Sequence, residues 1–216
     1  MKLINRWERK LYRFRIMPFF KYIILSMAGV YALQLFFPSF PLISRLSLWT
    51  AMVYKGEVWR LITFIFIPPM NSLMFAAITM YFYYFIGTAL ESKWGARRFL
   101  LYFLIGVLGA IIAALITGFG TNHYLLMSMF FAFAILYPEH ELLLFFILPI
   151  KMKWLGALNA VYYLYALIIG RWDTRAALLF SLLNLFLFFG GDIINLIRRT
   201  TAQWKRRRQF RNAQRR

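Results

Sequence analysis

The sequence predicts an all-α, polytopic membrane protein with six transmembrane helices and both termini in the cytoplasm. Three observations favour this fold class. The 216 residues are 62% hydrophobic and only 15% charged, whereas soluble domains carry about 45–50% apolar and about 25% charged residues. The apolar residues form long blocks, and basic residues flank these blocks at alternate junctions.

Six apolar blocks are candidates for membrane-spanning helices, which need about 20 apolar residues with a range of about 17–25. About 20 residues rich in basic and aromatic side chains precede the first block, so we interpret it as a signal anchor and not as a cleaved signal peptide. The fourth and fifth blocks are short, which favours tilted helices buried inside the bundle. The predicted spans are 19–37, 70–89, 99–117, 124–137, 154–170 and 176–197.

The distribution of Lys and Arg predicts the orientation of these spans. If the N-terminus is inside, the inner segments 1–21, 91–98, 138–153 and 198–216 hold 7, 3, 2 and 9 of the 26 basic residues. Basic residues accumulate in cytoplasmic loops. Both termini are therefore predicted to be cytoplasmic.

The segment after the first span, residues 38–69, is too apolar for a solvated loop. Prolines bracket it, and it contains Trp49 and Trp59 with few charged residues. Tryptophan favours the headgroup depth of a bilayer, and a long basic side chain can reach from there to water. We predict a helical segment lying in the outer interface, with Arg60 extending toward water.

The two ends of the chain are strongly basic and contribute much of the net charge of +19. In residues 1–18, apolar side chains recur every three or four positions, which is typical of an interfacial amphipathic helix. Residues 198–216 form a polybasic tail. We expect both ends to bind anionic lipids, and nucleic acid is the less favoured partner.

The residue types present exclude several chemistries. The chain has no cysteine and only two histidines, so we expect no metal site and no cofactor. His140 and Glu141 begin like a zinc-binding HExxH motif, but Leu144 stands at the second ligand position. The string FGGD at 189–192 is similar to an aspartyl-protease motif, but that chemistry needs a second carboxylate, and no other span holds an Asp.

Several short strings together resemble the rhomboid superfamily of six-helix membrane proteins. They have the same order and spacing over residues 22–197, and the matching strings are WR, FIGTALESKWGARRF, YPE followed by FFILPIKMKW, and FFGG. The residues that carry the resemblance are Trp59, Arg60, Gly87, Glu91, Pro138, Gly190 and Gly191. The resemblance implies a rhomboid-like bundle over residues 19–197.

Active rhomboids are intramembrane serine proteases, and this chain lacks their catalytic residues. The GxSG serine position falls on His123, and the histidine position of the sixth span falls on Phe188. The polar pair of the second span falls near Phe75 and Thr79. The resemblance therefore implies a pseudoprotease, and we expect the rings of Phe75 and Phe188 to fill the former catalytic cavity.

A displaced catalytic pair is not favoured by the spacing. Ser128 and His123 lie five residues apart on one predicted helix, about 140° around its axis. His140 lies 12 residues after Ser128, about 18 Å along such an axis. Neither histidine is expected within hydrogen-bond reach of Ser128.

The polar residues of the last span have a structural and a functional interpretation. Asp192 could pair with Lys151, Lys153 or Arg98 near the inner surface, or it could contact a client helix. Asn184, deeper in the span, could hydrogen-bond another helix or a client. We take both as candidate client contacts.

The scaffold residues have structural interpretations as well. Gly190 and Gly191 are expected to let the fourth and sixth spans approach closely. Glu91 is expected to anchor the bundle through Arg97, Arg98 or backbone groups. Trp59 and Arg60 are expected to hold the 38–69 segment in place.

Three functions remain open on this basis. The favoured one is a catalytically inactive protein, similar to the Derlins, that binds transmembrane segments of client proteins in quality control, retention or trafficking. The alternatives are a rhomboid protease with a displaced dyad and a structural or lipid-organising protein acting through its polybasic ends. The compact form suggests a bacterial plasma membrane, and the oligomeric state stays open.

Overall fold

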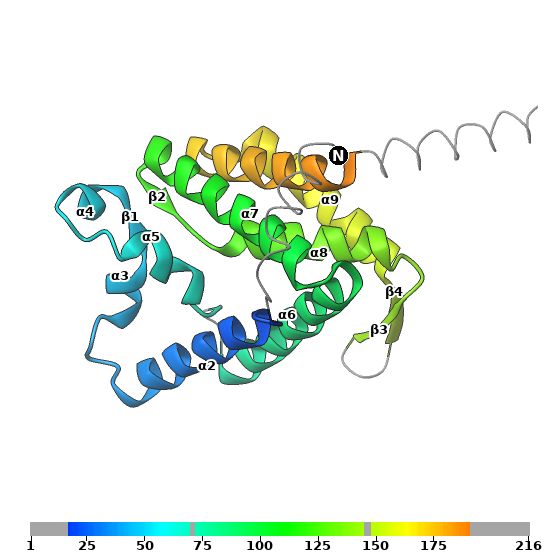
Figure 1. Ribbon diagram of the computed structural model, residues 1–216, viewed down its shortest axis with the longest axis horizontal. Coiled ribbons are helices and arrows are strands. Elements are labelled where there is room, and N and C mark those ends of the chain that lie inside the picture. Colours follow the sequence, from blue (N-terminus) through cyan, green and yellow to red (C-terminus); the bar gives the residue numbers. More distant parts are fainter. Residues whose placement is uncertain (1–16, 70–71, 145–147, 191–216) are drawn as a thin grey trace, which may run out of the picture.

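The computed structural model describes residues 17–69, 72–144 and 148–190, and most of them are helical. Four of the described helices are long and apolar enough to cross a membrane, and α2 and α8 are shorter apolar helices. The all-α, multi-pass class is therefore confirmed, while six crossings and cytoplasmic termini stay predictions. The principal helices are α2 (Phe20–Phe36), α6 (Leu73–Trp94), α7 (Ala96–Thr117), α8 (His123–Leu136), α9 (Met152–Ile169) and the last helix, Trp172–Gly190 (Figure 1).

Helix α8 occupies the centre of the bundle. Nine of its 14 residues are buried, on all sides of the helix, and 14 residues extend only about 21 Å. A helix surrounded by other helices need not match the thickness of the bilayer, and the predicted burial of the fourth span is confirmed. The prediction for the fifth span is wrong, because α9 has 18 residues and most of its side chains are exposed.

The first and last described helices meet at the same end of α6. The backbone N–H of Phe19 donates to Oε1 of Glu91, at 2.9 Å, so Glu91 anchors the bundle through a backbone group. The ring of Trp94 lies 5.1 Å from that of Phe189. Gly95 has a φ of +79°, a conformation that glycine adopts without strain, and it lets α7 begin directly after α6.

A ledge built from residues 38–69 covers the opposite end of the bundle, on the left in Figure 1. Its strand β1 pairs with β2 (Phe119–Gly120), which joins α7 to α8. Thr50 Oγ1 donates to the Ala114 carbonyl at 2.7 Å, and Asn122 Nδ2 donates to the Ile65 carbonyl at 3.0 Å. The elements of the ledge are α3 (Leu42–Leu46), β1 (Leu48–Trp49), α4 (Thr50–Tyr54), α5 (Arg60–Thr63) and η1 (Phe64–Phe66).

Arg60 does not extend toward water as predicted. Its side chain is buried, and its Nη1 donates to the carbonyls of Ser44 and Ser47 at 2.6 and 2.7 Å. Its other nitrogens pair with the Glu57 carboxylate, at 2.6 Å. Arg60 is satisfied by oxygens of the ledge itself, so it holds three parts of this segment together.

A β-hairpin follows α8 at the side of the molecule opposite the ledge (Figure 1). Strands β3 (Glu141–Leu144) and β4 (Leu148–Lys151) pair antiparallel. In the turn before β3, the Glu139 carboxylate binds Lys151 and Lys153 at 2.9 and 2.7 Å. Neither this hairpin nor the β1–β2 ladder was predicted, because both are too short to give an alternating apolar pattern.

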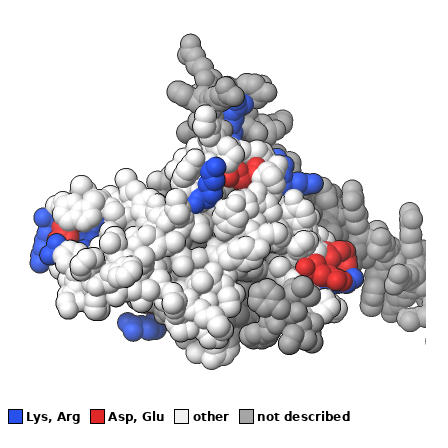
Figure 2. Space-filling model, turned by 90° about the horizontal axis from the view of Figure 1, so that it is seen from below, with Lys and Arg blue, Asp and Glu red and all other residues white. Residues whose placement is uncertain are grey.

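The surface of the described helices is largely apolar. Figure 2 shows that one face of the molecule is mostly uncharged, with the charged side chains gathered at a few places. Large apolar side chains are exposed along α2, α6, α9 and the last helix. Such a surface is typical of helices that face lipid.

Candidate functional site: a groove between α6, α8 and α9

A groove of about 800 Å³ lies between α6, α8 and α9. Aromatic and aliphatic side chains form nearly all of its surface, and two polar side chains, His123 and Asn159, interrupt it. Exposed apolar side chains of α6 and α9 surround the groove, as expected of a groove that opens toward lipid. Its walls are Phe82 and Tyr83 from α6, His123, Met127 and Phe130 from α8, and Leu155, Leu158, Asn159, Val161, Tyr162 and Tyr165 from α9.

The helical repeat explains why these residues share one surface. On α8, positions 123, 127 and 130 are separated by four and three residues, which places them on one face. On α9, positions 155, 158, 162 and 165 follow the same spacing. Helices α8 and α9 therefore each contribute one mostly apolar stripe, and the two stripes form adjoining walls.

Asn159 gives the groove an uncommitted hydrogen-bond donor. Its Nδ2 is buried and has no hydrogen-bond partner among the described residues. A buried amide donor without a partner is costly in an apolar environment. Because Nδ2 itself has almost no accessible surface, a rotation of the Asn159 side chain is needed to bring this donor to an acceptor in the groove.

The four degenerate catalytic positions do not come together. His123 lines the groove, whereas Phe188 is buried between the rings of Tyr102 and Trp94, at 5.1 and 6.3 Å. Ser181, and not Phe188, contacts the start of α8, because its Oγ donates to the Tyr124 carbonyl at 2.9 Å. Phe188 lies seven residues further along the helix, about 10 Å in rise.

The two phenylalanines that were expected to fill one former catalytic cavity lie in different surroundings. Phe188 is buried, but the ring of Phe75 is 51% exposed at the outer surface of α6. Thr79 donates to the Phe75 carbonyl at 2.7 Å, one turn back in the same helix. Both residues lie on a surface that faces outward, so Phe75 fills no interior space.

The two serine–histidine pairings considered from the sequence are not formed. Ser128 Oγ donates to the Leu125 carbonyl at 2.7 Å and accepts from the Tyr102 hydroxyl at 2.9 Å. His140 stacks on the ring of Phe85, at 5.5 Å between centroids. Among the described residues, no three His, Asp or Glu side chains gather as a metal site would require.

The residues that carry the rhomboid resemblance differ in their packing and in their hydrogen bonds. Gly87 allows close packing, because a Cβ there would overlap the ring of Phe20. At Gly190 a Cβ would meet no described atom within 4 Å, so the expected close approach is not seen at this position. The carbonyl of Pro138 accepts from the Lys153 backbone N–H at 3.0 Å and links the two ends of the hairpin segment. Trp59 is half-exposed on the ledge.

Of the two candidate client contacts, Asn184 is buried inside the bundle. Its Nδ2 donates to the Tyr102 carbonyl at 3.3 Å, so it contacts α7 and not the groove. Asp192 and Gly191 lie outside the described residues. Nothing in the sequence distinguishes Asn159 as a groove residue, because a single amide in an apolar helix does not show which neighbour it will face.

The long apolar helices place the chain in the class of multi-pass α-helical membrane proteins. A sequence model of one family, described as "Eukaryotic integral membrane protein (DUF1751)", matches residues 17–189. The chain belongs to this family. No curated protein matches the chain. Because this family is eukaryotic, the prediction of a bacterial plasma membrane is wrong. The compact size of the chain did not indicate the organism, because bilayer thickness sets the size of a helical bundle.

Proposed function

We propose that this chain is a catalytically inactive, rhomboid-like membrane protein that binds transmembrane segments of client proteins. Its role would be in quality control, retention or trafficking of membrane proteins. The observation that carries the proposal is the groove between α6, α8 and α9, with its unpartnered Asn159 amide. An apolar groove open to the bilayer suits a helix, and a lone donor favours a helix with an acceptor.

The absence of proteolysis is part of the proposal. The position that resembles the catalytic serine is His123, in the wall of the groove. The hydroxyl of Ser128 donates to a backbone carbonyl and accepts from Tyr102, so no described histidine is paired with it as a general base. A client helix in the groove would therefore meet a binding surface and no nucleophile.

A defined peptide can test binding in liposomes that contain the full chain. The probe is a fluorescent Leu/Ala transmembrane peptide with one Asn at mid-span, and energy transfer to the labelled protein reports its binding. Leu158→Trp should fill the groove and weaken binding at least about tenfold. Leu164→Trp is the matched control, because Leu164 is on the same helix and similarly exposed (61% against 67% for Leu158) but does not line the groove.

The Asn159 donor adds a second readout. Asn159→Leu should weaken binding of the Asn-bearing peptide by about 0.6–2 kcal/mol, roughly three- to thirtyfold, and leave an all-apolar peptide nearly unchanged. Equal binding by both tryptophan variants would exclude the groove as the site. Cleavage of the peptide, or labelling by a serine-reactive phosphonate, would overturn the inactive assignment.

A further inference from the structure

Helix α7 and the last helix pack closely at the middle of α7. A Cβ added at Gly106 would lie 2.8 Å from Asn184 Nδ2, and a Cβ added at Gly109 would lie 3.3 Å from Phe180 Cβ. These contacts pair rising numbers on α7 with falling numbers on the last helix, so the two helices run antiparallel. Glycine allows the close approach at both positions.

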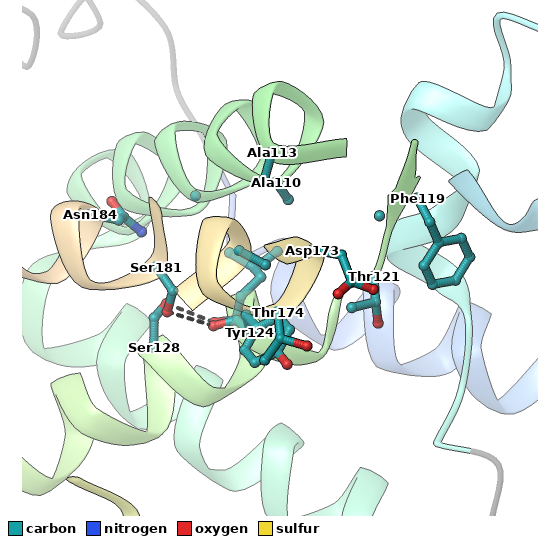
Figure 3. A pocket seen from close by; sticks show the side chains of 14 residues that line it. Ala110, Ala113, Phe119, Thr121, Tyr124, Ser128, Asp173, Thr174, Ser181 and Asn184 are labelled. Atoms are coloured by element: carbon teal, nitrogen blue, oxygen red, sulfur yellow. Dashed lines mark hydrogen bonds between the residues drawn. The ribbon is translucent and has the colours of Figure 1, made fainter. Parts of the chain in front are cut away.

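One face of this helix pair lines an interior cavity of about 200 Å³, on the side of α8 away from the client groove (Figure 3). Figure 3 shows Ser128, Ser181 and Asn184 in its lining. Ser128 Oγ donates to the Leu125 carbonyl, and Ser181 Oγ donates to the Tyr124 carbonyl. The hydroxyls of this interior cavity are therefore satisfied within the protein.

The same two helices separate toward the ledge, where β2 follows α7 and pairs with β1. A gap of about 620 Å³ opens between them there, around Ile116, which lies about 10 Å in rise beyond Gly109. Phe180, which contacts the Gly109 position, closes its inner end. We call this gap the wedge, and the residues that define it here are Ile116, Arg171, Trp172, Ala176, Leu179 and Phe180.

The walls of the wedge are apolar and open to the surroundings of the bundle. Ile116 is 69% exposed and Leu179 is 55% exposed. Exposed apolar side chains in a bilayer contact acyl chains. An acyl chain in the wedge would exchange one apolar neighbour for another and would supply the van der Waals contacts that an empty gap lacks.

The mouth of the wedge carries the chemistry of a headgroup site. Arg171 is 91% exposed and Trp172 is 80% exposed, and tryptophan favours headgroup depth. Arg171 Nε lies 3.9 Å from Asp173 Oδ1, beyond hydrogen-bond distance, and no described residue accepts a hydrogen bond from its guanidinium. A guanidinium binds phosphate through charge-assisted hydrogen bonds. Because Asp173 balances the charge of Arg171, the mouth favours a headgroup without net charge.

We propose that the wedge binds one zwitterionic phospholipid, with its phosphate at Arg171 and one acyl chain between Ile116 and Leu179. The lipid completes the packing of α7 against the last helix beside the ledge. The site is separate from the client groove, which lies between α6, α8 and α9. Its test is therefore independent of client binding.

Native mass spectrometry of the full chain in detergent can count bound lipids and measure the affinity of the first one. The probe is dioleoylphosphatidylcholine, and dioleoylglycerol has the same acyl chains without the phosphate. Leu179→Trp should fill the wedge and weaken binding of the first phosphatidylcholine at least about tenfold. Leu183→Trp is the matched control, because Leu183 lies one turn further on the same helix and is equally exposed (56% against 55%) but does not line the wedge.

Arg171→Gln should also weaken phosphatidylcholine roughly tenfold and leave dioleoylglycerol unchanged. Arg45→Gln removes another exposed cation, on the ledge, and should change neither lipid. Equal binding by the two tryptophan variants would place the lipid elsewhere and overturn the proposal. A loss in Leu179→Trp without a loss in Arg171→Gln would mean an apolar occupant with no headgroup recognition, and tighter binding of dioleoylphosphatidylglycerol would exclude a zwitterionic preference. Either result would overturn the proposal as well.

Discussion

The two sides of α8 contact very different surroundings. One side, with His123, Met127 and Phe130, lines an apolar groove of about 800 Å³ that faces the membrane. The other side, with Tyr124, Leu125 and Ser128, lines a cavity of about 200 Å³ enclosed by α7 and the last helix. The same short helix therefore separates an open apolar groove from a smaller cavity lined in part by polar side chains.

The difference shows how stability and recognition can be divided within one helix. Interior polar groups in a bilayer must find partners within the protein, and Ser128 is bonded on both sides for this reason. The side chains that line the groove make few internal hydrogen bonds, so substitutions there can change the binding of a client helix with little effect on the fold. We expect substitutions on the cavity side to affect folding and those on the groove side to affect binding.

The largest expected contrast is between two leucines. Leu125 is 3% exposed and Leu158 is 67% exposed. Leu125→Ala should lower the free energy of unfolding by about 2–5 kcal/mol, because the cavity it leaves is not refilled. Leu158→Ala should change it by less than about 0.5 kcal/mol. Unfolding of both variants in the same detergent would measure the difference, and similar losses would contradict the contrast between the buried cavity lining and the exposed groove wall.

A pair of glycines gives the next largest effect. A Cβ at Gly106 would lie 2.4 Å from Leu125 Cδ1 and 2.8 Å from Asn184 Nδ2, whereas at Gly29 it would meet nothing within 4 Å. Gly106→Val should therefore cost about 1–3 kcal/mol of stability through overpacking. Gly29→Val on the exposed surface of α2 is the control and should be nearly neutral. If thermal unfolding midpoints fall equally, α7 and the last helix do not pack as closely as described.

Removing one hydroxyl on each side gives a smaller effect. The Tyr102 hydroxyl donates to Ser128 inside the bundle, while Tyr162 is half-exposed in the groove. Tyr102→Phe should lower stability by about 0.5–1.5 kcal/mol, the usual net value of a buried hydrogen bond. Tyr162→Phe should leave stability unchanged. A double variant with Ser128→Ala should lose less than the sum of the single losses, which a double-mutant cycle would show.

The long helices could be predicted from the sequence because their length and composition are local properties. The block predicted at 99–117 corresponds to α7 (Ala96–Thr117), and the block at 124–137 corresponds to α8 (His123–Leu136). The bilayer sets a minimum length for apolar helices. The pattern therefore needs no knowledge of tertiary contacts.

The contacts between distant residues could not be predicted in this way. Arg60 is buried because carbonyls of Ser44 and Ser47 lie within its reach, and a sequence does not show which backbone groups will converge. The β1–β2 ladder joins residues about 70 positions apart through two residues on each strand. Asn159 and Asn184 look alike in the sequence, yet one faces the groove and the other the cavity.

The hairpin after α8 lies beyond both surfaces and should show the smallest effect. Lys151 and Lys153 hold the pKa of the exposed Glu139 carboxyl at about 2, below its ordinary value of 4.5. A lowered pKa means that the carboxylate contributes to folded stability above about pH 4.5, and that this contribution is lost as the pH falls toward 2. Glu139 in turn raises the pKa of Lys151 above its ordinary 10.5, so the stabilising contribution of the Lys151 charge is lost only at still higher pH.

Hydrogen exchange of the hairpin amides, corrected for the intrinsic pH dependence of exchange, should therefore be constant from about pH 5 to 10. Protection should fall below pH 4.5 in the natural chain and stay unchanged there in Glu139→Gln, which has no titrating group at this position. Because both partners are exposed to water, added salt should weaken the same protection at neutral pH. An equal fall of protection below pH 4.5 in the natural chain and in Glu139→Gln would show that Glu139 is not held by the two lysines.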